Sequence, residues 1–221
     1  MVIRTCVLVL LPALLICLAN CSRSEDAAAA TQAASTPATS RSAGSRPASF
    51  PLSLVHAARD QVGKTLSYDP TYTPLAYPGG DVVIEKGVCT DVVIRALRSA
   101  MQMDLQKLVH EDMRAAFAQY PQQWGLRSPD HNIDHRRVPN LMRYFDRQGW
   151  SVPVTQKKED YACGDLVTCT VAGKLPHIMV VSDRKGPDGA PMVIHNIGHG
   201  AQEEPRLFEF PLTGHYRLKM Q

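Results

Sequence analysis

The sequence predicts an α+β domain in which N-terminal helices pack on a C-terminal antiparallel sheet. Apolar residues recur at helical spacing up to about residue 148, and from about residue 165 they alternate as they do in strands. A turn-rich segment, 183–191, separates two short β-branched runs, which is the pattern of a hairpin. Because the helical pattern comes first and the strand pattern follows, we expect helices and strands to form separate layers.

The N-terminal segment 1–21 has the pattern of a bacterial export signal. Arg4 gives a basic start, and the apolar run from Thr5 to Ala19 is too short to span a bilayer securely. Its end, Leu18-Ala19-Asn20-Cys21, resembles the lipobox of bacterial lipoproteins, in which the cysteine becomes lipidated. We therefore expect a periplasmic protein anchored to the outer membrane of a Gram-negative bacterium through Cys21. A secreted protein cut near Ala19 is the alternative.

The next region, 22–50, is rich in Ala, Ser, Thr and Pro and holds almost no bulky apolar side chain. Such a segment cannot bury enough surface to fold, so we expect a disordered linker. Residues 51–221 then suit one domain. The net charge of +3 comes without a basic stripe and gives nucleic-acid binding little support. We expect no bridge between Cys163 and Cys169, because a strand would hold them too far apart.

Gly and Pro residues bound the helical patterns of the first half of the domain. The first pattern ends at Gly63, and the last opens at Pro139 and closes at Gly149. A segment rich in Tyr, Pro and Gly, 67–80, predicts a long loop, and such loops are often functional. We expect helices at 52–62, 89–101, within 105–120 and at 139–148, and strands at 165–171, 177–182, 192–196, 207–212 and 215–218.

Cys89, which opens the second predicted helix, is the most informative residue. A thiol at a helix N-terminus meets the positive end of the helix dipole, which favours the thiolate. His177 and His195 lie on two strands that the hairpin brings together, and we expect His177 to face the Cys89 helix. A nucleophile, a base and a group that orients the base then share one cleft. The alternative is a buried structural cysteine.

Several motifs resemble those of known bacterial families. One order of motifs resembles the NlpC-type cell-wall cysteine peptidases of the papain-like superfamily: Gly87-Val88-Cys89, Gly164-Asp165-Leu166-Val167, His177-Ile178-Met179 and Val193-Ile194-His195. A second set, over about residues 54–218, resembles the bacterial domain-of-unknown-function family 1287. It comprises the segment around Cys89, Ile133-Asp-His-Arg-Arg-Val138, Ile194-His-Asn-Ile-Gly198 and Gly214-His-Tyr-Arg217.

The NlpC-type resemblance implies a papain-like fold with Cys89 as nucleophile, His177 as general base and His195 as the third member. It also implies that Tyr68 lines the oxyanion side of the site. Those peptidases usually have Asp before the cysteine, where this chain has Val88, so the bond that is cleaved stays open. The implied protein is a monomeric cysteine peptidase or amidase, without cofactor or metal, that binds peptidoglycan or its peptide fragments.

We expect His135, Arg136 and Arg137, together with Tyr68, to bind the substrate, because a guanidinium fork suits the carboxylates of wall peptides. Helix capping and solvated charge are the alternative for this segment. The i, i+4 spacing of His131 and His135 also suits zinc, although it lacks the Glu of an HExxH site.

Three functions therefore stay open. The first is a hydrolase that cleaves an amide bond in peptidoglycan by a Cys-His-His mechanism. The second is a non-catalytic cell-wall-binding or scaffold lipoprotein that retains the fold. The third, with less support, is a zinc amidase built on His131 and His135.

Overall fold

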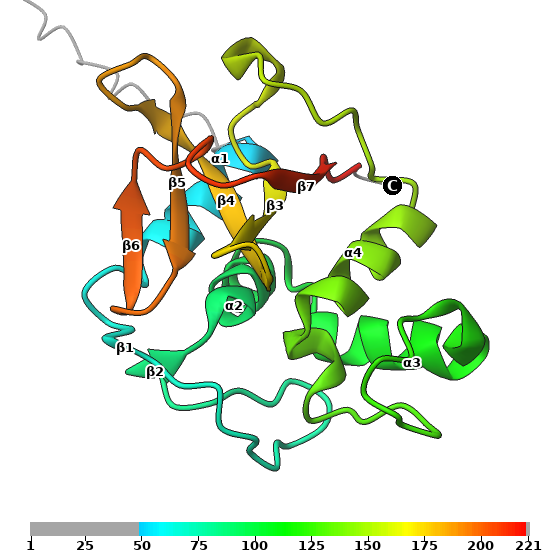
Figure 1. The fold of residues 1–221 in the computed structure, drawn as a ribbon. Helices are drawn as coiled ribbons and strands as arrows, with labels where there is room; N and C mark the ends of the chain where they lie inside the picture. Colours follow the sequence, from blue (N-terminus) through cyan, green and yellow to red (C-terminus); the bar gives the residue numbers. More distant parts are fainter. Residues whose placement is uncertain (1–48, 220–221) are drawn as a thin grey trace, which may run out of the picture. The chain divides into compact units, whose positions relative to one another are not determined.

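The computed structural model describes residues 49–219. The expected signal peptide, Cys21 and nearly all of the expected linker lie outside the described residues. No helix in the described part is long and apolar enough to cross a membrane. Within 49–219, four α-helices and a five-stranded antiparallel sheet confirm the predicted mixture of elements and its order along the chain (Figure 1).

The helices of the first half begin and end near the predicted residues. They are α1 (Phe50–Arg59), α2 (Cys89–Met101), α3 (Leu105–Ala116) and α4 (Val138–Arg147). Single turns of 3-10 helix lie between them and after them: η1 (Phe117–Gln119), η2 (Asp134–Arg136) and η3 (Lys158–Asp160). Pro occupies the first turn of both α1 and α4, where its missing N–H leaves no helical hydrogen bond unmade.

The second half forms one sheet with the strand order β6-β5-β4-β3-β7. Its strands are β3 (Leu166–Val171), β4 (Leu175–Lys185), β5 (Pro191–Asn196), β6 (Ala201–Glu204) and β7 (Leu212–Tyr216). β4 and β5 pair as the predicted hairpin. Two short strands, β1 (Ser67–Tyr68) and β2 (Lys86–Gly87), pair in parallel (Figure 1). β1 lies at the start of the segment 67–80 that was expected to be a loop, and β2 lies beyond its end.

The predicted strand at 207–212 is wrong. Leu207 begins a turn, and its side chain is 1% exposed, so the apolar pattern there reflects burial under the sheet. β7 therefore begins at Leu212 instead of at residue 215. β6 was not predicted, because its sequence, Ala-Gln-Glu-Glu, has low strand propensity and pairs only with β5.

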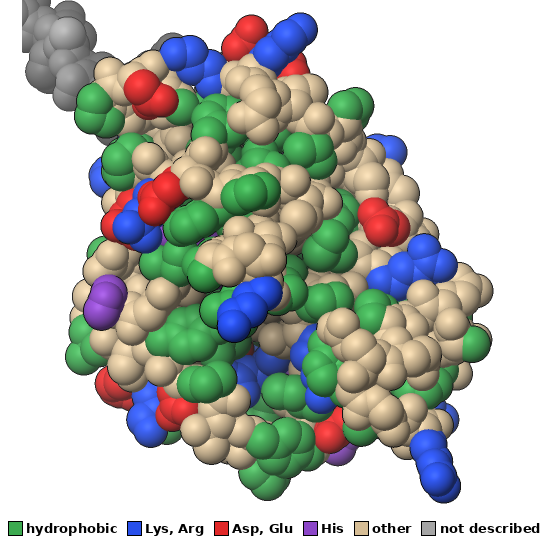
Figure 2. Space-filling view, in the orientation of Figure 1, with side chains coloured by type: hydrophobic (Ala, Val, Ile, Leu, Met, Phe, Trp, Pro, Cys, Tyr) green, Lys and Arg blue, Asp and Glu red, His purple; other side chains and the backbone are tan. Residues whose placement is uncertain are grey.

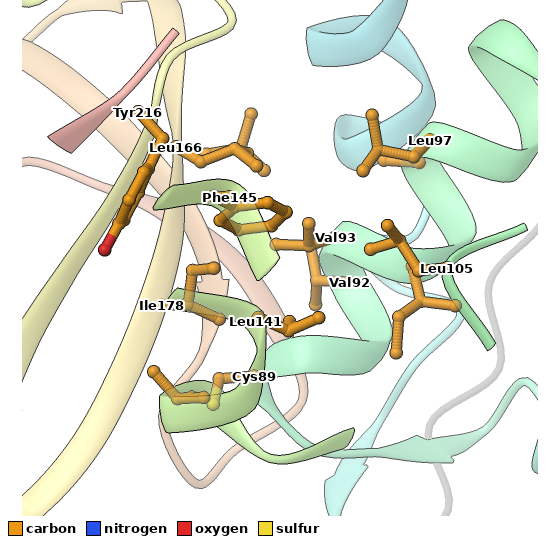
Figure 3. Packing of buried hydrophobic residues seen from close by; sticks show 14 of the residues in the cluster. Cys89, Val92, Val93, Leu97, Leu105, Leu141, Phe145, Leu166, Ile178 and Tyr216 are labelled. Atoms are coloured by element: carbon orange, nitrogen blue, oxygen red, sulfur yellow. The ribbon is translucent and has the colours of Figure 1, made fainter. Parts of the chain in front are cut away.

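Both faces of the sheet are buried. One face, called the helix face below, packs Ile178 and Ile194 against the helices, and Figure 3 shows Ile178 opposite Val92 of α2. The other face, called the loop face, packs Met179 against the segment around Leu207. Successive side chains along a strand point to opposite faces, so neighbouring residues of β4 contribute alternately to the helix face and to the loop face.

Candidate active site

Cys89 is the first residue of α2, as the sequence predicts. The N–H of the preceding residue, Val88, donates to Oδ2 of Asp91 at 2.7 Å, so Asp91 caps the helix beside the thiol. Asp91 also accepts hydrogen bonds from Nε and Nη2 of Arg136, each at 2.9 Å. This buried ion pair attaches the first turn of α2 to η2 and so fixes the backbone that carries Cys89.

Asn196 connects three segments of the site. Its Nδ2 donates to the carbonyl oxygen of Gly87 at 2.9 Å and to that of Ser67 at 3.2 Å. Gly87 ends the strand just before Cys89, and Ser67 precedes Tyr68, while Asn196 is fully buried at the end of β5. Sequence reasoning missed this residue. Its partners are backbone carbonyls of Ser67 and Gly87, and the sequence around them has no periodic pattern from which their position could be predicted.

The thiol of Cys89 is only 3% exposed, at one end of the helix-face core (Figure 3). Burial raises the pKa of this thiol to about 11, although backbone N–H groups, first that of Ile178, lower it by hydrogen bonding. The expectation of a thiolate is therefore wrong for this conformation, because desolvation outweighs the donors at the helix start. The contact with Ile178 nevertheless places the thiol against β4, one residue beyond His177.

His177 and His195 are brought together, and a third residue joins them. Nε2 of His177 lies 2.8 Å from Nδ1 of His195, and Nε2 of His195 lies 3.0 Å from Oε2 of Glu204. We call these three residues the histidine relay. Glu204 lies on β6, so the reasoning that missed this strand also missed Glu204.

The relay assigns a tautomer to each histidine. A carboxylate only accepts hydrogen bonds, so the proton between Glu204 and His195 is carried by Nε2 of His195. Nδ1 of His195 is then the acceptor for the Nε2 proton of His177. Nδ1 of His177 is left without a proton, which is the state that a general base requires.

The relay lies on the loop face of the sheet. His177 alternates with Ile178 along β4 and shares its side with Met179, away from α2. The expectation that His177 faces the Cys89 helix is therefore wrong, and the thiol and the imidazole reach the same end of β4 from opposite faces. Among the hydrogen bonds of residues 49–219, none joins Cys89 to His177.

Two cavities meet at this end of β4. The Cys89 pocket, of about 300 Å³, is lined by Cys89, Tyr68, Pro176 and residues of η2 and its neighbouring segments. A smaller cavity of about 160 Å³ is lined by His177 and again by Tyr68 and Pro176. Tyr68 and Pro176 therefore stand between the two reactive groups. Figure 2 shows a hollow in this face of the molecule with Lys or Arg side chains at its floor.

Burial also determines the protonation of the neighbouring groups. It lowers the pKa of His177 to about 3, and the charge of His195 adds to this effect. It lowers the pKa of His195 as well, against the opposing hydrogen bond with Glu204. It raises the pKa of Tyr68 to about 12, with the nearby charge of Cys89 as the next cause. The thiol, the phenol and the two imidazoles are therefore uncharged at neutral pH.

Comparison with known proteins gives this arrangement a family. The domain of unknown function DUF1287 matches residues 55–218. The chain belongs to this family. A relative named "Uncharacterized protein YijF", from Escherichia coli (strain K12), is 57% identical over 166 residues, which are 75% of this chain and 80% of the relative. The predicted likeness to family 1287 is thereby confirmed, over nearly the residues expected.

The four residues that the sequence predicts to bind substrate differ in whether they line the Cys89 pocket. Tyr68, Arg136 and Arg137 line the Cys89 pocket. His135 is 2% exposed and is not among the lining residues, and burial lowers its pKa to about 4. The structure therefore places His135 in the interior, behind the pocket that its neighbours line.

His131 and His135 of the DUF1287 domain do not share a helix face, because η2 covers only 134–136. The ring of His131 packs instead against those of Tyr77 and His110, with centroid separations of 5.2 and 5.8 Å. Within the described residues, no group of three or more His, Cys, Asp or Glu side chains is arranged to hold a metal ion. The zinc interpretation therefore lacks a ligand set in this part of the chain.

Proposed function

We propose that this DUF1287 protein is a cysteine hydrolase that cleaves an amide bond in peptidoglycan, with Cys89 as nucleophile and His177 as base. The main support is the histidine relay, in which the hydrogen bond with Glu204 leaves Nδ1 of His177 unprotonated. This nitrogen belongs to the residue next to Ile178, whose backbone N–H contacts the thiol of Cys89. Burying two linked imidazoles beside a partly exposed carboxylate is unfavourable for a core, and such groups cluster at functional sites.

The reaction is an acyl transfer in two stages. Nδ1 of His177 takes the thiol proton, the Sγ–C bond forms at the substrate carbonyl, and the C–N bond breaks as His177 returns the proton to the leaving amine. Water, deprotonated by His177, then attacks the thioester and releases the carboxylic acid and the thiol. The backbone N–H of Cys89, at the start of α2, has no acceptor within the helix and would stabilise the oxyanion once the thiol has turned.

The proposal requires one local rearrangement. The thiol must turn away from the N–H of Ile178 and toward His177, past Tyr68, which borders both cavities. Substrate in the Cys89 pocket would displace Tyr68, whose side chain is 40% exposed and so has room to move. His195 and Glu204 then stabilise the imidazolium that forms on His177.

The finer parts of the proposal rest on the sequence motifs. A papain-like, NlpC-type fold is supported by a cysteine that opens a helix and by histidines on the antiparallel strands that follow. The lipobox-like end at Cys21 supports action in the periplasm from an outer-membrane anchor, and we propose that the protein acts as a monomer. A protein anchored there is exposed to peptidoglycan, so we propose that it acts as a stem-peptide endopeptidase or as an amidase on this polymer.

A non-catalytic wall-binding or scaffold lipoprotein is the second candidate. It is favoured by the burial of the thiol, by its raised pKa and by the lack of a hydrogen bond between Cys89 and His177 among residues 49–219. A protein that only binds the wall needs the pocket, but it has no use for a relay that keeps one imidazole nitrogen unprotonated.

Incubation of purified muropeptides with the protein, followed by mass spectrometry, decides between these candidates. A hydrolase adds one water to a muropeptide and splits it into a new carboxylic acid and a new amine. The matched control is Cys89→Ala, which should bind the same muropeptides and cleave none. Binding without cleavage by the unaltered protein, or cleavage that survives in Cys89→Ala, would remove the proposed mechanism.

A further inference from the structure

The charged side chains that line the Cys89 pocket are of one sign. Arg136 and Arg137 line it, while no Asp or Glu does, and most of the remaining wall is apolar, with Trp124, Ile133 and Val138 among its residues. A concave apolar site with a few convergent polar groups is the usual form of a small-ligand site. Here those polar groups include two guanidinium groups, which match an anion.

Arg137 is held with part of its fork unoccupied. Its guanidinium carbon lies 4.1 Å from the centre of the Trp124 ring, which supports the group by a cation–π contact. Nη1 donates to Asp134 at 3.3 Å, and within 49–219 neither Nε nor Nη2 of Arg137 donates to another residue. Burial lowers the pKa of Arg137, against the charges of Asp134 and Asp130.

Arg136 supplies a second unoccupied donor. Its Nε and Nη2 are bound by Asp91, but Nη1 is buried and has no hydrogen-bond partner within the described chain. The residue as a whole is 7% exposed and lines the pocket. A buried donor without a partner is unfavourable and rare in folded proteins, so Nη1 of Arg136 is a vacant position for an acceptor.

We propose that the Cys89 pocket binds a carboxylate of the substrate, through the free edge of Arg137 and through Nη1 of Arg136. The substrate class, which rests on the proposed hydrolase function, is then a peptide with a free carboxylate close to the cleaved bond. A planar fork pairs with a carboxylate through two parallel hydrogen bonds, and the contact with Trp124 holds the fork of Arg137 in position before the ligand arrives.

The test compares two muropeptides that differ only in one group, a carboxylate in the first and a carboxamide in the second. Binding is measured by calorimetry with the Cys89→Ala protein, so that turnover does not interfere. The carboxylate form should bind at least about tenfold more tightly, and Arg137→Gln should remove this preference, a loss of about 10- to 100-fold for the carboxylate form only. Arg137→Lys keeps the charge without the fork and should retain part of it.

Arg127→Gln is the matched control, because Arg127 is an exposed arginine in the same loop as Trp124 and does not line the pocket. It should leave the affinity for both muropeptides unchanged. If thermal melting shows that Arg137→Gln has lost its fold, Trp124→Leu replaces it, since that change removes the support of the Arg137 fork.

Equal affinity for the two muropeptides, an equal loss for both in Arg137→Gln, or no binding of either overturns the carboxylate site. These outcomes are separable from the failure of the hydrolase. If the protein prefers the carboxylate form but cleaves neither muropeptide, the hydrolase function is contradicted and the carboxylate site is supported. If the protein cleaves both muropeptides at equal rates, the carboxylate site is contradicted and the hydrolase function is supported.

Discussion

Cys89 and His177 are both uncharged for the same reason, which is that each is buried before any substrate is present. The pKa of the thiol is raised to about 11 and that of the imidazole is lowered to about 3, so the proton belongs on sulfur in this conformation. A thiolate–imidazolium pair is therefore not the resting state. Under the proposed mechanism, proton transfer must accompany the attack on the substrate or follow a rearrangement that substrate induces.

Alkylation of the thiols tests this point. Cys89 should react slowly with iodoacetamide at pH 7 and faster as the pH rises toward about 11, because the thiolate is the nucleophile and burial raises its pKa. Cys163 is the internal comparison, since it is half-buried and should react first. Peptide mass spectrometry after timed labelling gives both rates. A Cys89 rate that has already reached its plateau below pH 7 would mean that the ion pair exists in the resting protein.

Substitutions in the histidine relay should reduce turnover in a graded order. His177→Ala removes the base and should lower kcat/KM by about 10²–10⁴-fold. His195→Asn keeps a hydrogen-bonding side chain and should retain measurable activity. Glu204→Gln keeps an acceptor without its charge, and we expect a loss of about tenfold, as for one pKa unit of base strength.

The matched control for this series is Glu203→Gln on the same strand. Glu203 binds Arg59 and Ser182 and takes no part in the relay, so its loss should lower the unfolding temperature and leave kcat unchanged. Losses of kcat that are equal for Glu203→Gln and Glu204→Gln would show that β6 acts only as a structural strand.

At the scale of elements, Asn196 joins the β1–β2 pair to the main sheet. Asn196→Ala leaves the carbonyls of Gly87 and Ser67 without their donor and should lower the free energy of unfolding by about 1–3 kcal/mol. Urea unfolding measures this loss, and hydrogen exchange should locate it in β1 and β2. Gln202→Ala, a polar deletion on the neighbouring strand β6, is the control. Unchanged exchange in β1 and β2 would contradict the assigned role.

The elements that the sequence predicts are those with a strong local signal. The apolar stripe of α2 and the turn-rich segment 183–191 place a helix and a hairpin almost without error, and with them the approach of His177 to His195. β6 and the β1–β2 pair have no such signal, because they are short and stabilised by pairing with distant strands. Glu204 and Asn196 were missed with these elements.

The orientation of His177 was missed for a different reason. Alternation shows that His177, Met179 and Val181 share a face, but both faces of this sheet are buried, so composition does not say which of them meets α2. The burial of Cys89 was an alternative that the sequence could not decide. Whether the helix dipole or desolvation dominates the pKa of a thiol depends on what covers it, and Tyr68 of β1, which lies beside Cys89, is distant from it in sequence.

For the whole molecule, the buried histidines predict sensitivity to acid. The pKa of His177 falls from 6.5 to about 3 on folding, and that of His135 falls from 6.5 to about 4. Below pH 6.5 the unfolded chain therefore binds protons that the folded chain does not, so the free energy of unfolding should decrease as the pH falls from 6.5 toward 4. Asp134, whose pKa burial raises to about 6, acts in the opposite sense and offsets part of this decrease.

Urea unfolding between pH 7.5 and 5 checks the effect. His135→Asn should reduce the slope by up to about 1.4 kcal/mol per pH unit, the value for one proton. A free energy of unfolding that rises on acidification, or a slope that His135→Asn does not alter, would contradict the linkage.

The division of the proposed site between the two halves of the chain has a consequence for biosynthesis. A ribosome makes the helix that carries Cys89 long before the strands that carry His177, His195 and Glu204. An incomplete chain therefore has the Cys89 thiol without the relay, and a C-terminal fragment has the relay without Cys89. Under the proposed mechanism neither can cut the bonds of the cell wall. If the proposed mechanism holds, only a finished chain, with its last strands in the sheet, assembles the complete set of reacting groups.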